Sequence, residues 1–313
     1  MEQILLTFII GVLILLYSTQ RFVRLAENIS LAFKISPLII GTTIVALGTS
    51  VPELTVSTVS SFNQDFDLAV ANIIGSNIAN IFLVLAIGIL IGKLRIGTVK
   101  TQRNAVILIG ATVLFFLVYS LGLPHQFAAL ILLSTAAVIS IAEYSLGVLG
   151  RNHEDLSRFK KLTKVKIGSS TLLSLVIFIC GIILGGYLIV SSVEVFSKVT
   201  GISTSFLGLT LTAIVTSLPE LFTTVLSQKD HEEKIAIGNI LGSNIYNLVF
   251  IGGVIMLFPI SVQINPLDWI WLAGATACAF LVIKKYAGKQ PPKLIAAAFL
   301  TLFLVYLYTI SVV

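Results

Sequence analysis

Long apolar runs recur along the whole chain, separated by short segments that carry charged or turn residues. Most of these runs reach the roughly 20 apolar residues that an α-helix needs to cross a bilayer. The pattern therefore predicts an all-α polytopic membrane protein with ten transmembrane helices. These helices are expected over residues 3–19, 37–62, 68–92, 104–122, 126–148, 168–194, 203–227, 235–258, 267–283 and 293–312.

The composition leads to the same fold class. Apolar residues make up 57% of the 313 residues and charged residues only 11%, whereas soluble domains carry about 25% charged residues. A soluble globular protein is therefore excluded. The net charge of +6 does not indicate nucleic-acid binding, because the 20 basic residues are spread between the apolar runs and form no single basic patch.

Residues that could hold a resident metal or cofactor are few and isolated. Cys180 and Cys278 each lie inside an apolar run, and the three histidines form neither an HExxH motif nor a cluster with cysteine. Zinc and redox chemistry are therefore not expected, and we expect no cofactor. The chain begins Met1-Glu2-Gln3 without the basic segment of a signal peptide, so the first run is expected to remain as a helix.

The positions of the basic residues predict the orientation of the chain. With ten spans, 19 of the 20 Lys and Arg residues fall on one side of the membrane, and only Lys198 falls on the other. Because Lys and Arg in short loops mark the cytoplasmic side, both termini are expected outside. An incorrect number of spans would have distributed the Lys and Arg residues over both sides of the membrane.

The chain contains an internal repeat. Residues 36–84 align without a gap to residues 203–251, at a constant offset of 167 and with 18 identities in 49 positions. We therefore expect a first five-helix unit at 1–148, a cytoplasmic connecting loop at 149–167 and a second five-helix unit at 168–313. Since the two units start on opposite sides of the membrane, they form an inverted repeat, an arrangement of secondary transporters that places the site at the midplane.

The first polar patch of each repeat contains an acidic residue in mid-span. It reads Ala-x-x-Thr-Ser-x-Pro-Glu, from Ala46 to Glu53 and from Ala213 to Glu220. In a continuous helix the alanine, the two hydroxyls and the carboxylate would share one face, and the proline would free a backbone carbonyl near the threonine. A glutamate at the bilayer centre costs about 2.5–3.5 kcal/mol. No basic residue lies in either span, so each glutamate needs another compensating partner.

The second patch of each repeat is a polar stripe with a residue every fourth position. Its members are Asn72, Ser76 and Asn80 in the first half, and Asn239, Ser243 and Asn247 in the second. Asparagine often joins membrane helices by hydrogen bonds, which is the preferred interpretation for Asn72, Asn77, Asn239 and Asn244. Gly75, Gly242 and the pair Gly181 and Gly185 are expected to let helices approach closely.

Together the patches offer only oxygen ligands: two carboxylates, hydroxyls, amide carbonyls and freed backbone carbonyls. Ca²⁺ takes six to eight oxygens in adaptable geometry, whereas Mg²⁺ dehydrates reluctantly and soft metals prefer Cys or His. Two carboxylates would neutralise one Ca²⁺, and the same oxygens could hold several Na⁺. The hydroxyls are those of Thr49, Ser50, Ser76, Thr216, Ser217 and Ser243.

The segments GTTIVALGTSVPEL and GNILGSNIYN resemble the two alpha repeats of the sodium/calcium exchanger family, in the cation/Ca²⁺ exchanger superfamily. The resemblance covers both 49-residue repeats and implies a small prokaryotic member without a large regulatory domain. It also implies a central Ca²⁺ site made by Glu53, Glu220 and the carbonyls of Thr49 and Thr216. One flanking Na⁺ site would use the Ala46 carbonyl, Thr49, Ser50, Ser243 and Glu220. The other would use the Ala213 carbonyl, Thr216, Ser217, Ser76 and Glu53, with Asn80 and Asn247 in the middle.

The sequence departs from the family pattern at Asn247, where many members carry aspartate. An amide adds no charge, which makes potassium dependence less expected and leaves the number and identity of the coupling ions open. The leading hypothesis is a secondary antiporter that exchanges Ca²⁺ for Na⁺ by alternating access, rather than an enzyme. The alternatives are an H⁺/Ca²⁺ antiporter, a passive Ca²⁺ channel and an intramembrane enzyme. The expected location is the inner (plasma) membrane of a prokaryotic cell, with no nucleic-acid partner and no obligate protein partner.

Overall fold

The computed structural model describes residues 1–32, 46–91, 94, 96, 99–149, 169–229, 233–259 and 264–312, which are helical with short turns and contain no β-strand. The α-helices are α1 (Glu2–Ala32), α3 (Ala46–Thr49), α4 (Val51–Phe62), α5 (Phe66–Ala79), α6 (Ala86–Ile91), α7 (Val99–Ser120), α8 (His125–Leu149), α10 (Ser169–Thr200), α11 (Thr204–Leu207), α12 (Ala213–Thr216), α13 (Leu218–Lys229), α14 (Glu233–Tyr246), α15 (Gly252–Ile255), α16 (Pro266–Lys285) and α17 (Lys293–Val312). Three π-helical segments join some of them, namely η2 (Asn80–Leu85), η3 (Gly208–Thr212) and η4 (Asn247–Ile251).

The all-α polytopic membrane fold is confirmed. Within the described ranges, nine helices are long and apolar enough to cross a membrane. The predicted second span, 37–62, is described only from Ala46 onwards, as α3 and α4. The count of ten spans therefore stays a prediction, and the predicted connecting loop at 149–167 lies outside the described residues except for Leu149.

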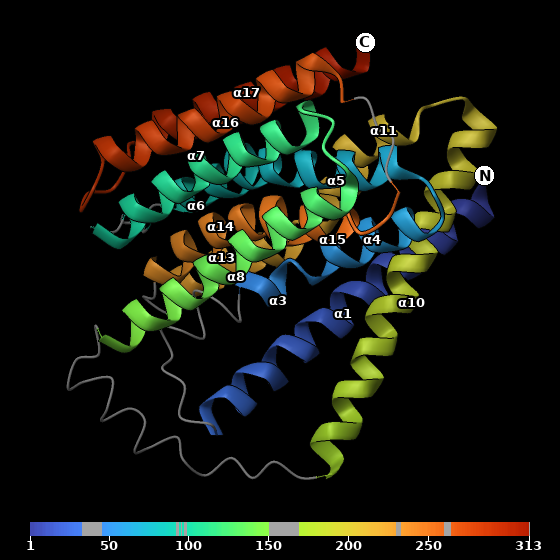
Figure 1. Cartoon of the computed structure of the whole chain (residues 1–313), viewed down its shortest axis with the longest axis horizontal. Helices are drawn as coiled ribbons and strands as arrows, with labels where there is room; N and C mark the ends of the chain where they lie inside the picture. Colours follow the sequence, from blue (N-terminus) through green and yellow to red (C-terminus); the bar gives the residue numbers. More distant parts are fainter. Residues whose placement is uncertain are drawn as a thin grey trace.

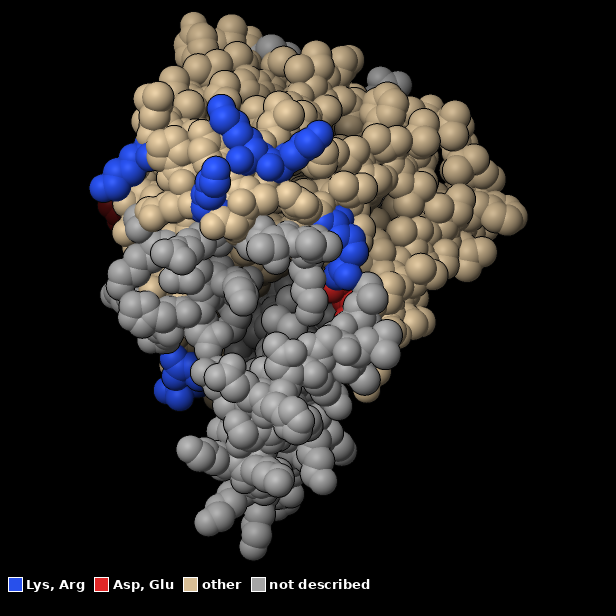
Figure 2. Space-filling view, turned by 90° about the vertical axis from the view of Figure 1, so that its left-hand side faces the viewer, with Lys and Arg blue, Asp and Glu red and all other residues tan. Residues whose placement is uncertain are grey.

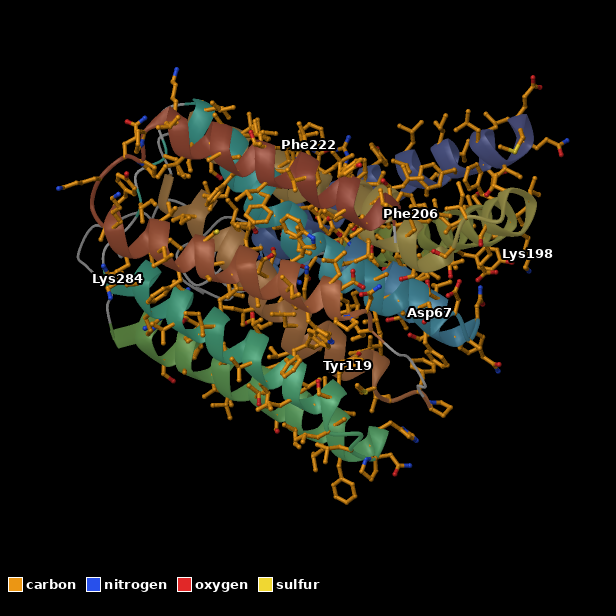
Figure 3. All side chains as sticks on the ribbon, turned by 90° about the horizontal axis from the view of Figure 1, so that it is seen from above. Asp67, Tyr119, Lys198, Phe206, Phe222 and Lys284 are labelled. Atoms are coloured by element: carbon orange, nitrogen blue, oxygen red, sulfur yellow. The ribbon has the colours of Figure 1, made fainter. Side chains whose placement is uncertain are left out.

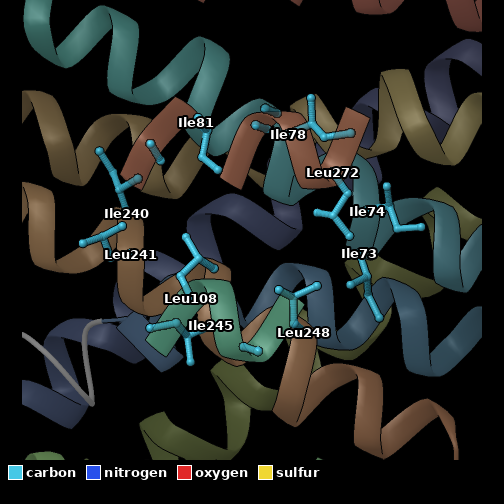
Figure 4. Close-up of a cluster of buried hydrophobic side chains, with 14 of the residues drawn as sticks. Ile73, Ile74, Ile78, Ile81, Leu108, Ile240, Leu241, Ile245, Leu248 and Leu272 are labelled. Atoms are coloured by element: carbon cyan, nitrogen blue, oxygen red, sulfur yellow. The ribbon is translucent and has the colours of Figure 1, made fainter. Parts of the chain in front are cut away.

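The two most buried spans form the centre of the molecule. They are the continuous path α5–η2–α6 and the path α14–η4–α15, each with 83% of its apolar window buried, compared with 22–39% in the other seven spans. Their apolar side chains meet those of α7 and α16 in a shared core that includes Ile73, Ile78, Ile240 and Leu248 (Figure 4). Because the second polar patches lie on these central helices, the core holds them away from lipid.

Two long helices, α1 and α10, pack against each other at one side of the bundle (Figure 1). Glycines allow their close approach. A Cβ atom added at Gly185 would lie 2.7 Å from the Leu15 backbone nitrogen, and one added at Gly181 would lie 2.3 Å from the Ser18 hydroxyl oxygen. The predicted small-residue contact at Gly181 and Gly185 is confirmed.

The two ends of the helix bundle differ in charge. Lys284 lies at one end, whereas Lys198 and Asp67 lie at the opposite end (Figure 3). Lysine and arginine side chains gather on the face that contains the Lys284 end (Figure 2), and Lys284, Lys285 and Lys289 are exposed there. Both chain ends lie towards the Lys198 end (Figure 1). We call the Lys284 end the basic end of the bundle.

Candidate functional site

Two helix breaks bring the predicted glutamates to helix starts. The predicted second span, 37–62, is interrupted at Ser50, between α3 and α4, and Glu53 lies in the first turn of α4 next to Pro52. The other is interrupted at Ser217, between α12 and α13, and Glu220 lies in the first turn of α13. The expectation of one continuous helical face is therefore wrong at these two serines. Proline is favoured in a first turn because its missing N–H would have no partner there, and the free N–H groups of that turn favour a carboxylate.

Both carboxylates are completely buried and are joined across the two halves of the chain. The side chains of Glu53 and Glu220 are 0% exposed. The Ser217 hydroxyl donates to Glu53 Oε1 at 3.4 Å, and the Ser50 hydroxyl donates to Glu220 Oε1 at 3.4 Å. The second oxygen, Oε2, of each carboxylate has no hydrogen-bond partner. Each glutamate thus keeps one buried oxygen available for a ligand.

The threonines connect each first patch with the second patch of the other half. The hydroxyls of Thr49 and Ser243 lie 3.2 Å apart, and Thr49 also donates to Asn239 Oδ1 at 3.0 Å. The matching hydroxyls of Ser76 and Thr216 also lie 3.2 Å apart, and Thr216 donates to Asn72 Oδ1 at 3.4 Å. At the repeat offset of 167, Thr49 corresponds to Thr216, Ser76 to Ser243 and Asn72 to Asn239. The contacts are therefore reciprocal.

Two asparagines in the centre start π-helical segments. Asn80 opens η2 and Asn247 opens η4, and both side chains are 0% exposed. Asn80 donates to Asn244 Oδ1 at 3.0 Å, but its own Oδ1 has no partner. At Asn247 neither the amide oxygen nor the amide nitrogen has a partner. A widened turn is common at functional sites, and no signal in the sequence indicated these segments.

Two alanines, Ala46 and Ala213, are predicted to supply backbone carbonyl ligands. Ala213 is 0% exposed, and its carbonyl accepts hydrogen bonds from the Ser217 backbone N–H at 3.1 Å and the Thr216 hydroxyl at 3.3 Å. Ala46 begins α3, and its side chain lies outside the described part. The other predicted site residues are all buried, namely Thr49, Ser50, Glu53, Ser76, Asn80, Thr216, Ser217, Glu220, Ser243 and Asn247.

Three of the four asparagines predicted to join helices do so. Asn77 does not, because its amide donates to the Ile73 carbonyl of its own helix, α5, at 2.8 Å and its Oδ1 has no partner. Asn72 donates to the Ser57 hydroxyl at 3.1 Å and to the Glu53 backbone carbonyl at 3.4 Å, which ties α5 to α4. Asn244 donates to the Asn77 carbonyl at 3.4 Å, which ties α14 to α5. These side chains are used in structural bonds, unlike the unpartnered amide of Asn247.

The ligand atoms of the site are those that a hard cation prefers. Two carboxylates share a buried cluster of hydroxyls and amides, and the one salt bridge among the described residues joins Arg103 and Glu143. No basic side chain therefore neutralises Glu53 or Glu220 there. Buried charges are costly unless they are paired, and oxygen-only ligands suit Ca²⁺ and other hard cations. The cluster can compensate its charge with bound cations or with protons.

The chain is similar to known membrane proteins over most of its length. The family model described as "Sodium/calcium exchanger protein" matches residues 3–145 and again residues 170–312, at the offset of the internal repeat. The inner membrane protein YrbG of Escherichia coli is 32% identical over 265 residues, covering 83% of this chain and 81% of YrbG. The sodium/calcium exchanger MaX1 of Methanosarcina acetivorans is 28% identical over 294 residues, covering 82% of this chain and 84% of MaX1. A solved structure of the sodium-calcium exchanger NCX_Mj, soaked with Na⁺ and Sr²⁺, is similar with a TM-score of 0.62 and 25% identity, over 96% of each chain.

Proposed function

Because the chain belongs to the sodium/calcium exchanger protein family, we propose that it is a secondary antiporter that exchanges Ca²⁺ for Na⁺ by alternating access. The observation that carries this proposal is the pair of fully buried carboxylates, each with one unpartnered oxygen and with no basic partner in the described residues. Cation binding would supply the missing compensation. The names of the sodium/calcium exchanger MaX1 and the sodium-calcium exchanger NCX_Mj support Na⁺ as the coupling ion.

In this proposal Glu53 and Glu220 bind Ca²⁺ together with the backbone carbonyls of Thr49 and Thr216. Two carboxylates neutralise the double charge of one Ca²⁺, so both are needed. Na⁺ would occupy two flanking sites that reuse the same carboxylates. The first would be made by Ala46, Thr49, Ser50, Ser243 and Glu220, and the second by Ala213, Thr216, Ser217, Ser76 and Glu53, with Asn80 and Asn247 between them.

Shared ligands supply the physical basis of exchange. If Ca²⁺ and Na⁺ need the same carboxylate oxygens, they cannot be bound together, and each ion must leave before the other enters. The carboxylates and the serine hydroxyls that bond them are nearly or fully buried, with an exposed fraction of 0–3%. Transport then requires the site to open to one side of the membrane and afterwards to the other.

The orientation is proposed from the charges. The basic end of the bundle would face the cytoplasm, because Lys and Arg in short loops are retained there, and both termini would lie outside. The chain is a multi-pass membrane protein, and one relative is named an inner membrane protein. We propose the inner (plasma) membrane of a prokaryotic cell as its location, with ten spans in two inverted five-helix units.

The test is uptake of ⁴⁵Ca²⁺ into proteoliposomes. Vesicles loaded with Na⁺ and diluted into Na⁺-free buffer are expected to accumulate Ca²⁺, whereas vesicles loaded with K⁺ are not, because Na⁺ is the proposed coupling ion. Saturating external Na⁺ should inhibit uptake by competing for the same oxygens. Uptake that follows a proton gradient and ignores Na⁺ would replace Na⁺ by H⁺ as the coupling ion. Uptake without any gradient of a second cation would indicate a channel.

A second prediction separates ligand binding from folding at Asn247. Asn247→Leu should slow exchange and leave the free energy of unfolding unchanged or higher, because this amide has no partner in the protein. In contrast, Asn72→Leu should destabilise by about 1–3 kcal/mol, since it removes hydrogen bonds from three buried groups: the Ser57 hydroxyl, the Glu53 carbonyl and the Thr216 hydroxyl. Thermal unfolding in detergent and ⁴⁵Ca²⁺ uptake measure the two effects. Equal loss of stability in both variants would assign Asn247 a structural role.

A further inference from the structure

A polar stripe continues from the site along α13. Glu220, Thr224 and Gln228 are spaced four residues apart, so they lie on one face of the helix. All three side chains are 0% exposed. The stripe leads from the carboxylate to the last turn of α13, which ends at Lys229.

The outer members of this stripe are not satisfied by the protein. Neither Thr224 Oγ1 nor Gln228 Oε1 has a hydrogen-bond partner. The Gln228 amide donates only to the backbone carbonyl of Thr224, at 3.2 Å. An unpartnered buried oxygen destabilises the conformation in which it is buried. These two oxygens therefore indicate a second conformation of the protein, in which water or an ion reaches them.

Gly88 of α6 leaves the space that these side chains occupy. A Cβ atom added at Gly88 would lie 3.0 Å from Thr224 Cγ2, 3.3 Å from Gln228 Nε2 and 3.4 Å from Leu94 Cδ2. Just beyond Leu94, the Ile96 N–H donates to the Lys289 carbonyl at 3.0 Å, and the Ile96 carbonyl accepts from Gly288. The stripe therefore runs towards the basic end of the bundle, where Lys289 is exposed.

The matching positions in the first half behave differently. Ser57 and Ser61 precede Thr224 and Gln228 by 167 residues and lie on α4. The Ser57 hydroxyl donates to the Ala69 carbonyl at 3.1 Å, and the Ser61 hydroxyl donates to the Ser57 carbonyl at 2.8 Å. Backbone oxygens thus satisfy both serines. The unsatisfied oxygens of Thr224 and Gln228 are therefore not a general property of this face of the repeat.

We propose that Thr224 and Gln228 line the path by which cations pass between Glu220 and the basic end of the bundle. Their oxygens would replace part of the water around a cation as it moves through an otherwise apolar region. This inference rests on the proposed function and adds residues that the exchange site itself does not include.

The test is thiol accessibility in a variant with Cys180→Ala and Cys278→Ala. Gln228→Cys is treated in sealed vesicles with a membrane-impermeant, cationic methanethiosulfonate reagent added to one side at a time. Two exposed positions, Lys289→Cys and Lys198→Cys, identify the two sides. Leu226→Cys is the matched control, because Leu226 lies on the same helix with 48% exposure on the outside of the bundle, where lipid would surround it.

We expect Gln228→Cys to react only from the side on which Lys289→Cys reacts, and to lose Ca²⁺ uptake as it reacts. Its rate should exceed that of Leu226→Cys by about tenfold or more, because only a hydrated thiol ionises. The proposed path would be contradicted if Gln228→Cys reacted from the side on which Lys198→Cys reacts, or if it reacted no faster than Leu226→Cys. If Gln228→Cys does not fold, Thr224→Cys gives the same readout. Absence of Na⁺-driven uptake in the unsubstituted protein would instead refute the proposed function.

Discussion

Glu53→Gln and Glu220→Gln should each abolish Na⁺-dependent Ca²⁺ uptake in protein that folds normally. Each substitution keeps the shape of the side chain but removes one of two negative charges from a fully buried site. The remaining carboxylate cannot neutralise Ca²⁺ by itself, and a divalent ion left partly uncompensated in a buried cluster is strongly disfavoured. ⁴⁵Ca²⁺ uptake into Na⁺-loaded proteoliposomes measures the loss.

A binding measurement makes the same prediction independent of transport. At a Ca²⁺ concentration 100 times its dissociation constant, the ion should raise the free energy of unfolding of the unsubstituted protein by about 2.7 kcal/mol. This increase should vanish in both variants. Without Ca²⁺ they should be at least as stable as the parent, because a neutral amide replaces an unpaired buried charge. Thermal unfolding with and without Ca²⁺ gives both values.

Glu194→Gln provides the matched control. Glu194 is an acidic residue of α10 that accepts a hydrogen bond from Asn63 at 3.0 Å and takes no part in the buried cluster. This variant should keep Ca²⁺ uptake and Ca²⁺-dependent stabilisation. Near-normal uptake by either Glu53→Gln or Glu220→Gln would contradict a Ca²⁺ site shared between the two carboxylates.

Gly75→Val should both destabilise the protein and stop transport. A Cβ atom at Gly75 would lie 2.6 Å from the Leu209 carbonyl oxygen, 2.8 Å from Leu209 Cα and 2.7 Å from Ala213 Cβ. Backbone atoms of a packed helix cannot move aside as a flexible side chain can. Overpacking of this kind typically costs about 1–3 kcal/mol, and it would push η3 and Ala213 away from α5.

The control for Gly75→Val is Gly110→Val on α7. No atom lies within 4 Å of a Cβ atom added at Gly110, so the same change of residue type meets open space there. Thermal unfolding in detergent should show a lower transition temperature for Gly75→Val only, and uptake should be lost only in that variant. If Gly75→Val were as stable and active as Gly110→Val, the close approach of α5 and η3 would not be needed for the site.

Much of this protein is determined by its sequence because a bilayer imposes a simple local rule. An apolar run of sufficient length must become a helix whose backbone groups are bonded within the helix. Nine of the predicted spans are accordingly recognisable in the described residues. The repeated Thr-Ser-x-Pro-Glu and Asn-x-x-Gly-Ser-Asn patches also identify the residues that meet in the buried cluster, since polar groups in mid-membrane must find partners.

Only the tertiary structure decides which buried oxygen atoms are left without a hydrogen-bond partner. Ser217 bonds Glu53 and Ser50 bonds Glu220 across 164 and 170 residues, and these bonds occupy one oxygen of each carboxylate while the other stays unpartnered. Whereas Pro52 and Pro219 already predict disturbed helical bonding beside Ser50 and Ser217, the π-helical turns at Asn80 and Asn247 and the unsatisfied stripe at Thr224 and Gln228 have no signal in the sequence pattern. They depend on how helices from distant parts of the chain pack, because a hydrogen bond needs its partner within about 3.5 Å, whereas an apolar run needs only lipid.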